Sequence, residues 1–97
     1  MRILHYAGCE LVTTDRVAEA LLDYLVTLPL NHPPERVTIP ALRDGVAVVA
    51  ELVISALAPL VATTTEGGEV ALDGEEYAVD VLRHRMTRLG SIGLGRF

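Results

Sequence analysis

His5, Cys9 and Glu10 are the residues of this sequence whose types and spacing come closest to a reactive site. Ala7-Gly8 predicts a two-residue hairpin turn, which places His5 directly opposite Glu10 on the neighbouring strand. A carboxylate beside an imidazole orients the ring and makes it a better general base. Tyr6, next to His5 in the chain, is a further candidate for such a site. The same pair also suits a purely structural ion pair, which is the interpretation that the sequence favours.

The thiol of Cys9 is poorly placed to act together with His5. Neighbouring residues of a strand point to opposite faces, so Cys9 is expected on the face away from His5, as a buried free thiol. A single cysteine forms no intramolecular disulfide, which fits a reducing cytoplasm. His32, in a proline-rich loop, and His84, on the polar side of a predicted helix, are expected to be solvated.

Motifs that bind cofactors or metals are missing from the sequence. It contains no phosphate-binding loop, no dinucleotide fingerprint, no HExxH zinc motif, no paired cysteines and no lysine for a Schiff base. The glycines from Gly90 to Gly95 reverse the dinucleotide spacing and follow a predicted helix instead of preceding one. We therefore predict no cofactor, no metal, and no catalytic residues beyond the candidates His5, Glu10 and Tyr6.

Positive charge gathers near the C-terminal end of the sequence. Residues 1–80 contain all 13 acids and four arginines, whereas the remainder contains no acid and a basic patch of Arg83, Arg85, Arg88 and Arg96. Such a patch is one way to bind nucleic-acid phosphates or an acidic partner. Contact with the chain's own acidic segment 66–80 is favoured over nucleic-acid binding, and a helix dipole explains three of the four arginines without any ligand. The net charge of -5 argues against a dedicated nucleic-acid or membrane-surface protein.

Apolar residues are more abundant than one small core requires. They make up 51% of the 97 residues, against 22% charged residues, which excludes a disordered chain and indicates one small domain. The simplest outcome is self-association, as a dimer, with interface candidates Leu22, Val26, Pro40, Val49 and Val53. The alternative is a monomer whose two helices cover all of the apolar surface.

Short turn signals predict two hairpins. Ala7-Gly8 lies between the runs 2–6 and 9–13, and Asp44-Gly45 lies between 36–43 and 46–54. In the second hairpin a two-residue turn gives the pairs Val37–Leu52, Ile39–Ala50 and Ala41–Val48 on one face, and Thr38–Glu51 on the other. A slip of one residue would turn Glu51 into the core, which fixes this register.

Pro40 lies within the run 36–43 and cannot donate to a sheet ladder, so its strand is expected at a sheet edge. A further strand is predicted at 60–65, and a possible short one at 70–72.

Two amphipathic helices complete the pattern. The first is capped by Thr14 or Asp15 and runs to about residue 28, with an apolar stripe of Val17, Leu21, Tyr24, Leu25 and Leu28. The second begins with Asp73 as its cap and ends at Gly90.

These elements predict an α+β two-layer sandwich in the order β-β-α-β-β-β(-β)-α. A mainly antiparallel sheet of about four to six strands carries two helices on one face. Residues 1–90 form the single domain and 91–97 a flexible glycine-rich tail. The apolar run 46–65 is not expected to cross a membrane, because Glu51 and Pro59 interrupt it.

The composition and the lack of a secretory signal fit a cytoplasmic bacterial protein. We predict a non-catalytic, self-associating interaction or binding module. The alternatives are a small enzyme or ligand-binding protein with a subunit-interface site around His5 and Glu10, and weak binding of nucleic acid or an acidic partner through the arginine-bearing helix.

Overall fold

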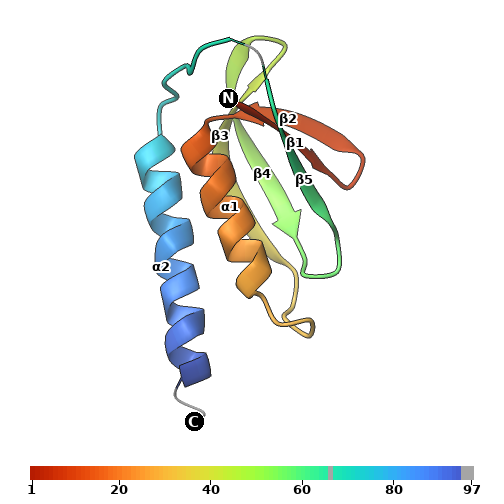
Figure 1. Cartoon of the computed structure of the whole chain (residues 1–97), viewed down its shortest axis with the longest axis vertical. Coiled ribbons are helices and arrows are strands. Elements are labelled where there is room, and N and C mark those ends of the chain that lie inside the picture. The colour runs from red at the N-terminus through yellow and green to blue at the C-terminus, as the bar shows by residue number, and fades with distance from the viewer. Residues whose placement is uncertain (66, 95–97) are drawn as a thin grey trace.

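Five antiparallel strands form one open sheet, and two helices lie side by side against it (Figure 1). The computed structural model describes residues 1–65 and 67–94, with backbone only for 90–94. The strands are β1 (Arg2–Tyr6), β2 (Cys9–Thr13), β3 (Glu35–Arg43), β4 (Val46–Ile54) and β5 (Leu60–Thr64), and the helices are α1 (Asp15–Thr27) and α2 (Glu75–Leu94). This architecture confirms the predicted α+β class and order of elements. Residues 70–72, the possible short strand, are not in a strand.

Both hairpins turn through two residues with positive backbone φ angles. The angle is 51° at Ala7 and 82° at Gly8, and 51° at Asp44 and 79° at Gly45. Positive φ at both central positions gives the turn whose twist matches that of the flanking strands. The predicted registers are confirmed in both hairpins, including the pairs His5–Glu10 and Thr38–Glu51.

The sheet is curved, because its two edge strands follow each other directly in the chain. The strand order is β4-β3-β2-β1-β5, so residues 55–59 carry the chain from one edge to the other. Strands about 4.8 Å apart would place the edges of a flat five-stranded sheet roughly 19 Å apart. That distance needs an almost fully extended connection at about 3.3–3.6 Å per residue. The connection is bent instead, since the Ala58 N–H donates to the Ser55 carbonyl at 3.3 Å. The sheet must therefore curve, which brings the end of β4 nearer to the start of β5.

The core lies between the helices and the inner face of this curved sheet. Leu4 from β1, Leu21 from α1 and Ile39 from β3 are among its fully buried members. Helix α1 begins where predicted, with the Thr14 hydroxyl accepting from the Val17 N–H at 3.2 Å. Its predicted apolar stripe is buried, except that Leu25 is only half-buried.

The position of Pro40 corrects one prediction. Its strand β3 lies second in the sheet, between β4 and β2, and not at an edge. Proline is tolerated there because β2 pairs with β3 only at Val12 and Leu42. The Pro40 carbonyl accepts from the Thr13 hydroxyl at 2.7 Å and so points toward β2. The N–H and C=O of a strand residue point to the same side, so the missing N–H of Pro40 costs no bond to β4.

Helix α2 differs from its prediction at both ends. The Gly74 carbonyl accepts the first helical hydrogen bond, from the Ala78 N–H at 2.9 Å, so Gly74 and not Asp73 precedes the helix. At its other end the helix continues through Gly90 to Leu94. A glycine inside a helix costs only about 1 kcal/mol, which is too little to force an end. The predicted tail is thus helical at 91–94, and 95–97 lie outside the described residues.

Candidate functional site

His5 is the middle member of a line of three polar side chains that crosses three strands. Its Nδ1 lies 3.3 Å from Oε1 of Glu10 on β2, and its Nε2 lies 3.2 Å from Oγ1 of Thr63 on β5. Strand β1 lies between those two strands, so neighbours on both sides reach the ring. A carboxylate, an imidazole and a hydroxyl lie in this spatial order in catalytic triads, where they activate the hydroxyl as a nucleophile.

The surroundings of this line do not favour catalysis. The side chains of His5 and Glu10 are 37% and 71% exposed, whereas charge stabilisation in a catalytic site is strongest where bulk solvent is excluded. A hollow of about 330 Å³ is bordered by His5 and Glu10 but not by Thr63, so a molecule within it would miss the hydroxyl. The geometry agrees with the predicted structural ion pair, extended by one hydrogen bond to β5.

Cys9 and Tyr6 lie side by side at the end of the first hairpin. Cys9 is exposed, so the prediction of a buried thiol is wrong; its position next to the turn leaves it uncovered. Tyr6 is buried, and its hydroxyl accepts from the Ser55 N–H at 2.9 Å, which ties β1 to the end of β4. This contact gives Tyr6 a structural role.

Thr63 is the member of the line that the sequence did not reveal. It lies 58 residues from His5 in the chain, on a strand that pairs with β1 only through the tertiary fold. Nothing local in the sequence around Thr63 predicts that pairing.

A second polar cluster joins α1, β3 and α2. The Tyr24 hydroxyl donates to Oε1 of Glu35, while Nη1 of Arg85 lies 3.9 Å from the other Glu35 oxygen. Arg85 also donates to the Arg36 carbonyl at 3.3 Å. Burial raises the pKa of Tyr24, the hydrogen bond to the Glu35 carboxylate and its charge raise it further, and Arg85 opposes this only in part. The phenol therefore stays neutral beyond its usual range.

The predicted basic patch is partly neutralised by the chain itself. Nη1 of Arg83 lies 2.5 Å from Oδ2 of Asp23 on α1, and Arg85 faces Glu35 on β3. These partners differ from the acidic segment 66–80 that the sequence suggested. The helix-dipole explanation is also wrong, because α2 ends at Leu94, more than one turn beyond Arg88, and the dipole acts within the last turn. Arg96 lies outside the described residues, and His84 is exposed as predicted.

Strand β4 presents an open edge nine residues long. Hydrogen-bonded and non-hydrogen-bonded pairs alternate along an antiparallel ladder. Because the Pro40 carbonyl points toward Thr13, the pair Pro40–Val49 is of the second kind. It follows that the backbone N–H and C=O groups that point away from β3, toward the open edge, belong to Ala47, Val49, Glu51 and Val53.

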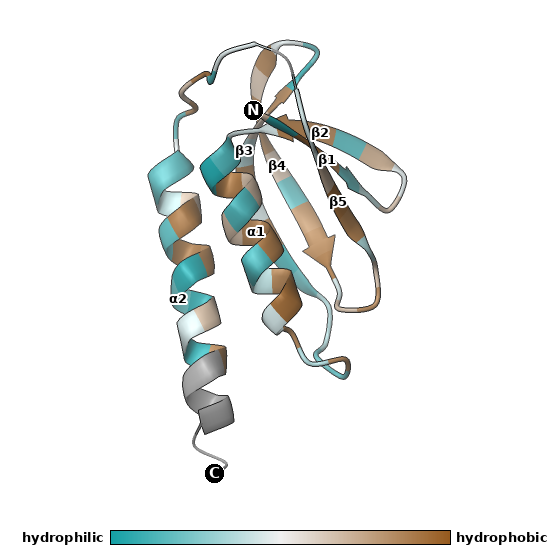
Figure 2. Cartoon of the chain, viewed as in Figure 1, coloured by the Kyte–Doolittle hydropathy of each residue, from teal (hydrophilic) through white to brown (hydrophobic). Residues whose placement is uncertain are grey.

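The side chains along this edge are mostly apolar, as the brown colour along most of β4 shows (Figure 2). Val49 and Val53 are 73% and 67% exposed. A hollow of about 560 Å³ borders the strand, with residues 48–52 on one side and 8–11 of the first hairpin on the other. A long apolar strand edge is therefore accessible from outside.

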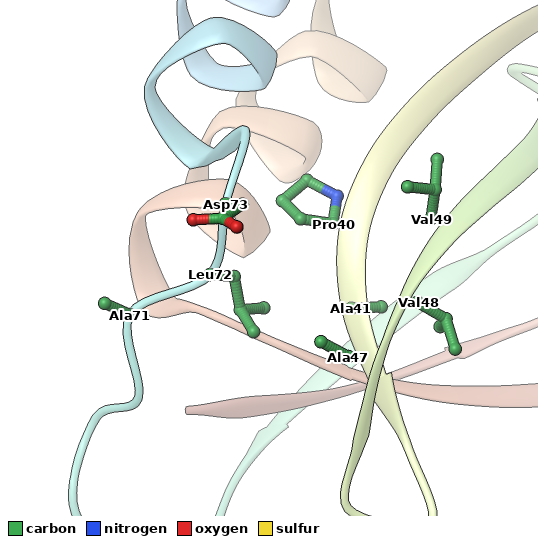
Figure 3. A pocket seen from close by; sticks show the side chains of 8 residues that line it. All are labelled: Pro40, Ala41, Ala47, Val48, Val49, Ala71, Leu72 and Asp73. Atoms are coloured by element: carbon green, nitrogen blue, oxygen red, sulfur yellow. The ribbon is translucent and has the colours of Figure 1, made fainter.

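The other predicted interface residues are distributed differently. Val26 on α1 is 82% exposed, whereas Leu22 is half-buried. Pro40 is buried within one chain, so its prediction as an interface residue is wrong. Its ring points toward Leu72 and Asp73, across a hollow of about 330 Å³ that these residues share with β3 and β4 (Figure 3). Residues 71–73, which precede α2, line the other side of this hollow.

No known protein family, curated protein or solved structure matches this chain. Within residues 1–65 and 67–94, no three His, Cys, Asp or Glu side chains gather closely enough to hold a metal ion. Neither helix of that part of the chain has the length and apolarity needed to cross a membrane.

Proposed function

We propose that this chain is a non-catalytic interaction module that dimerises through the open edge of β4. The proposal rests on one observation: β4 is a nine-residue edge strand with exposed valines. Four of its residues point their backbone N–H and C=O groups away from β3, toward the open edge. Such an edge is a template for another strand, and monomeric proteins prevent pairing at their edge strands with charges, prolines or bulges. Strand β4 contains one charge, Glu51, and no proline.

A second copy of the chain is the occupant that fits this edge best. Antiparallel pairing around a two-fold axis at Ala50 brings the whole of β4 against the whole of its copy. This register uses all four outward-facing residues of each strand and yields about eight hydrogen bonds. It places Val49 opposite Glu51 of the other copy, and Ala47 opposite Val53. Two five-stranded sheets thereby become one continuous sheet with an isologous interface.

The opposite edge of the sheet supports the choice of β4. Strand β5 has only five residues, Leu60–Thr64, and three of these are Ala or Thr. Shorter and more polar edges are among the devices that keep sheets from pairing. The longer and more apolar edge is the one expected to associate.

The mass in solution tests this proposal directly. Light scattering on a sizing column, at low and at high salt, is expected to give the mass of a dimer in both, because backbone hydrogen bonds and apolar contacts are little affected by screening. A monomer at all accessible concentrations would exclude the proposal. A dimer that dissociates at high salt would point to an electrostatic interface elsewhere.

Hydroxyl activation at His5 is the second candidate function, carried by the 3.2 Å contact between His5 Nε2 and Thr63 Oγ1. In this case His5→Ala and Thr63→Val would each abolish turnover of an activated ester without loss of stability. If His5→Ala only lowers the stability of the fold, the line is structural. Turnover that survives Thr63→Val would equally remove Thr63 as the nucleophile.

A further inference from the structure

A hollow of about 370 Å³ lies where α2 passes the loop before β3. Its walls are Tyr24, His32, Glu35, Arg85, Arg88 and Leu89. Arg85 and Arg88 are three residues apart on α2, so both side chains leave the same side of the helix. The loop that carries His32 is held by a hydrogen bond from the His32 N–H to the Pro29 carbonyl at 2.9 Å.

This hollow has an excess of positive charge in a chain that is acidic as a whole. Its one carboxylate, Glu35, accepts from Tyr24 with one oxygen and faces Arg85 with the other. Among the described residues, no carboxylate lies within ion-pair distance of Arg88. Neither the helix dipole nor a carboxylate of the described residues thus accounts for Arg88. Its planar fork of N–H donors matches the oxygens of a phosphate group.

His32 lines the hollow from the loop before β3. Its Nδ1 lies 2.8 Å from the Pro33 carbonyl, and a carbonyl only accepts, so Nδ1 carries a hydrogen. Nε2 therefore has a lone pair in the neutral ring and is a donor in the protonated ring. The charged and titratable groups that line the hollow with it are Tyr24, Glu35, Arg85 and Arg88.

We propose that this hollow binds the dianionic phosphate group of a small metabolite. Arg88 holds the phosphate from α2, Arg85 adds a second guanidinium, and His32 adds a donor from the loop when it is protonated. Leu89 and the Tyr24 ring give an apolar wall for the rest of the ligand. Donors that arrive from two elements suit a tetrahedral dianion better than a planar carboxylate with one charge. No residue of β4 lines the hollow, so the site does not depend on the proposed dimer.

Inorganic phosphate and sulfate are the probes that test this site, followed by backbone NMR at constant ionic strength. We expect saturable one-to-one shifts at the amides of residue 32 and residues 85–89. Arg88→Ala is expected to weaken binding about tenfold or more, since it removes a charge-assisted, bidentate contact. Arg16→Ala is the matched control, because Arg16 is an exposed arginine on α1 that does not line the hollow.

Sulfate keeps its double charge where phosphate takes up a proton, so sulfate tests the site with a ligand of fixed charge. His32→Gln should weaken sulfate binding, because it removes the imidazole from the loop side of the hollow. Shifts that grow linearly without saturation, or equal losses in Arg88→Ala and Arg16→Ala, would overturn the site. Tighter binding of acetate than of phosphate would overturn the choice of a dianion. Arg88→Gln repeats the test with a longer polar side chain if Arg88→Ala disturbs the fold.

Discussion

Proline substitution at two adjacent positions of β4 tests the proposed interface most sharply. The backbone of Val49 faces the open edge, whereas that of Ala50 faces Ile39 on β3. Val49→Pro therefore removes a hydrogen-bond donor from the dimer alone. Ala50→Pro removes one from the ladder within the chain. The two variants differ by one position in the sequence, but Val49→Pro is expected to weaken the dimer and Ala50→Pro to destabilise the single chain.

The magnitudes follow from the bonds that each variant loses. Ala50→Pro removes one backbone hydrogen bond between β4 and β3, which costs about 0.5–1.5 kcal/mol of stability. It also leaves the carbonyl of the buried Ile39 without a donor, which costs about 1–3 kcal/mol more. At roughly 4–8 °C per kcal/mol, the melting temperature should fall by about 6 °C or more. Val49→Pro loses no bond within the chain, so its monomer should stay within about 1 kcal/mol of the parent. In the dimer it loses one donor per copy, about 1–3 kcal/mol in all, which weakens association roughly 5- to 150-fold.

Two assays read out these variants. Sedimentation equilibrium gives the dissociation constant, and urea unfolding of dilute protein gives the stability of the chain. Val49→Thr is the control, because it keeps both the N–H and the branched shape and should leave the dimer intact. If Val49→Pro unfolds the chain while Ala50→Pro does not, the assignment of inward and outward groups along β4 is wrong. A dimer unaffected by Val49→Pro would show that β4 is not the interface.

Three further predictions rest on single side chains. Glu51→Gln should tighten the dimer about twofold at low salt, because the two carboxylates lie diagonally across the two-fold axis at about 7–8 Å, and sedimentation at several salt concentrations measures this. Because the pKa of Tyr24 is raised in the folded state, the neutral phenol stabilises the fold fully below about pH 10, where an unfolded tyrosine ionises. This stabilisation is lost as the pH rises from there toward the folded-state pKa of Tyr24. Tyr24→Phe should remove this alkaline loss of stability, as measured by urea midpoints at several pH values. Thr14→Ala should cost about 0.5–2 kcal/mol in urea unfolding because it removes the cap of α1, whereas Thr27→Ala, near the exposed end of the same helix, should cost less.

The features that the sequence predicted correctly are those fixed by neighbours in the chain. Both hairpin registers follow from a two-residue turn and from the alternation of side chains around it, as the pairs His5–Glu10 and Thr38–Glu51 show. The start of α1 follows from Thr14 and the apolar spacing after it. Each of these features needs information from only about twenty residues.

The features that it missed depend on contacts between distant segments. The contact of Thr63 with His5 requires β5 to pair with β1, and the surroundings of Pro40 include residues 71–73, about thirty residues further along the chain. The length of α2 was missed for another reason. Gly90 predicts a helix end, but a glycine weakens a helix by only about 1 kcal/mol, and packing elsewhere along the helix offsets that cost.

The two proposed sites rely on different forces, and salt separates them. The edge of β4 offers backbone groups and valines, so association there should be nearly independent of ionic strength. The hollow beside Arg88 offers exposed charges, so phosphate binding should weaken as salt rises. A single series of salt concentrations, with mass and phosphate binding measured on the same sample, therefore distinguishes the two. If dimerisation and phosphate binding disappear together, Arg88 and its neighbours hold the subunits together, and β4 is not the interface.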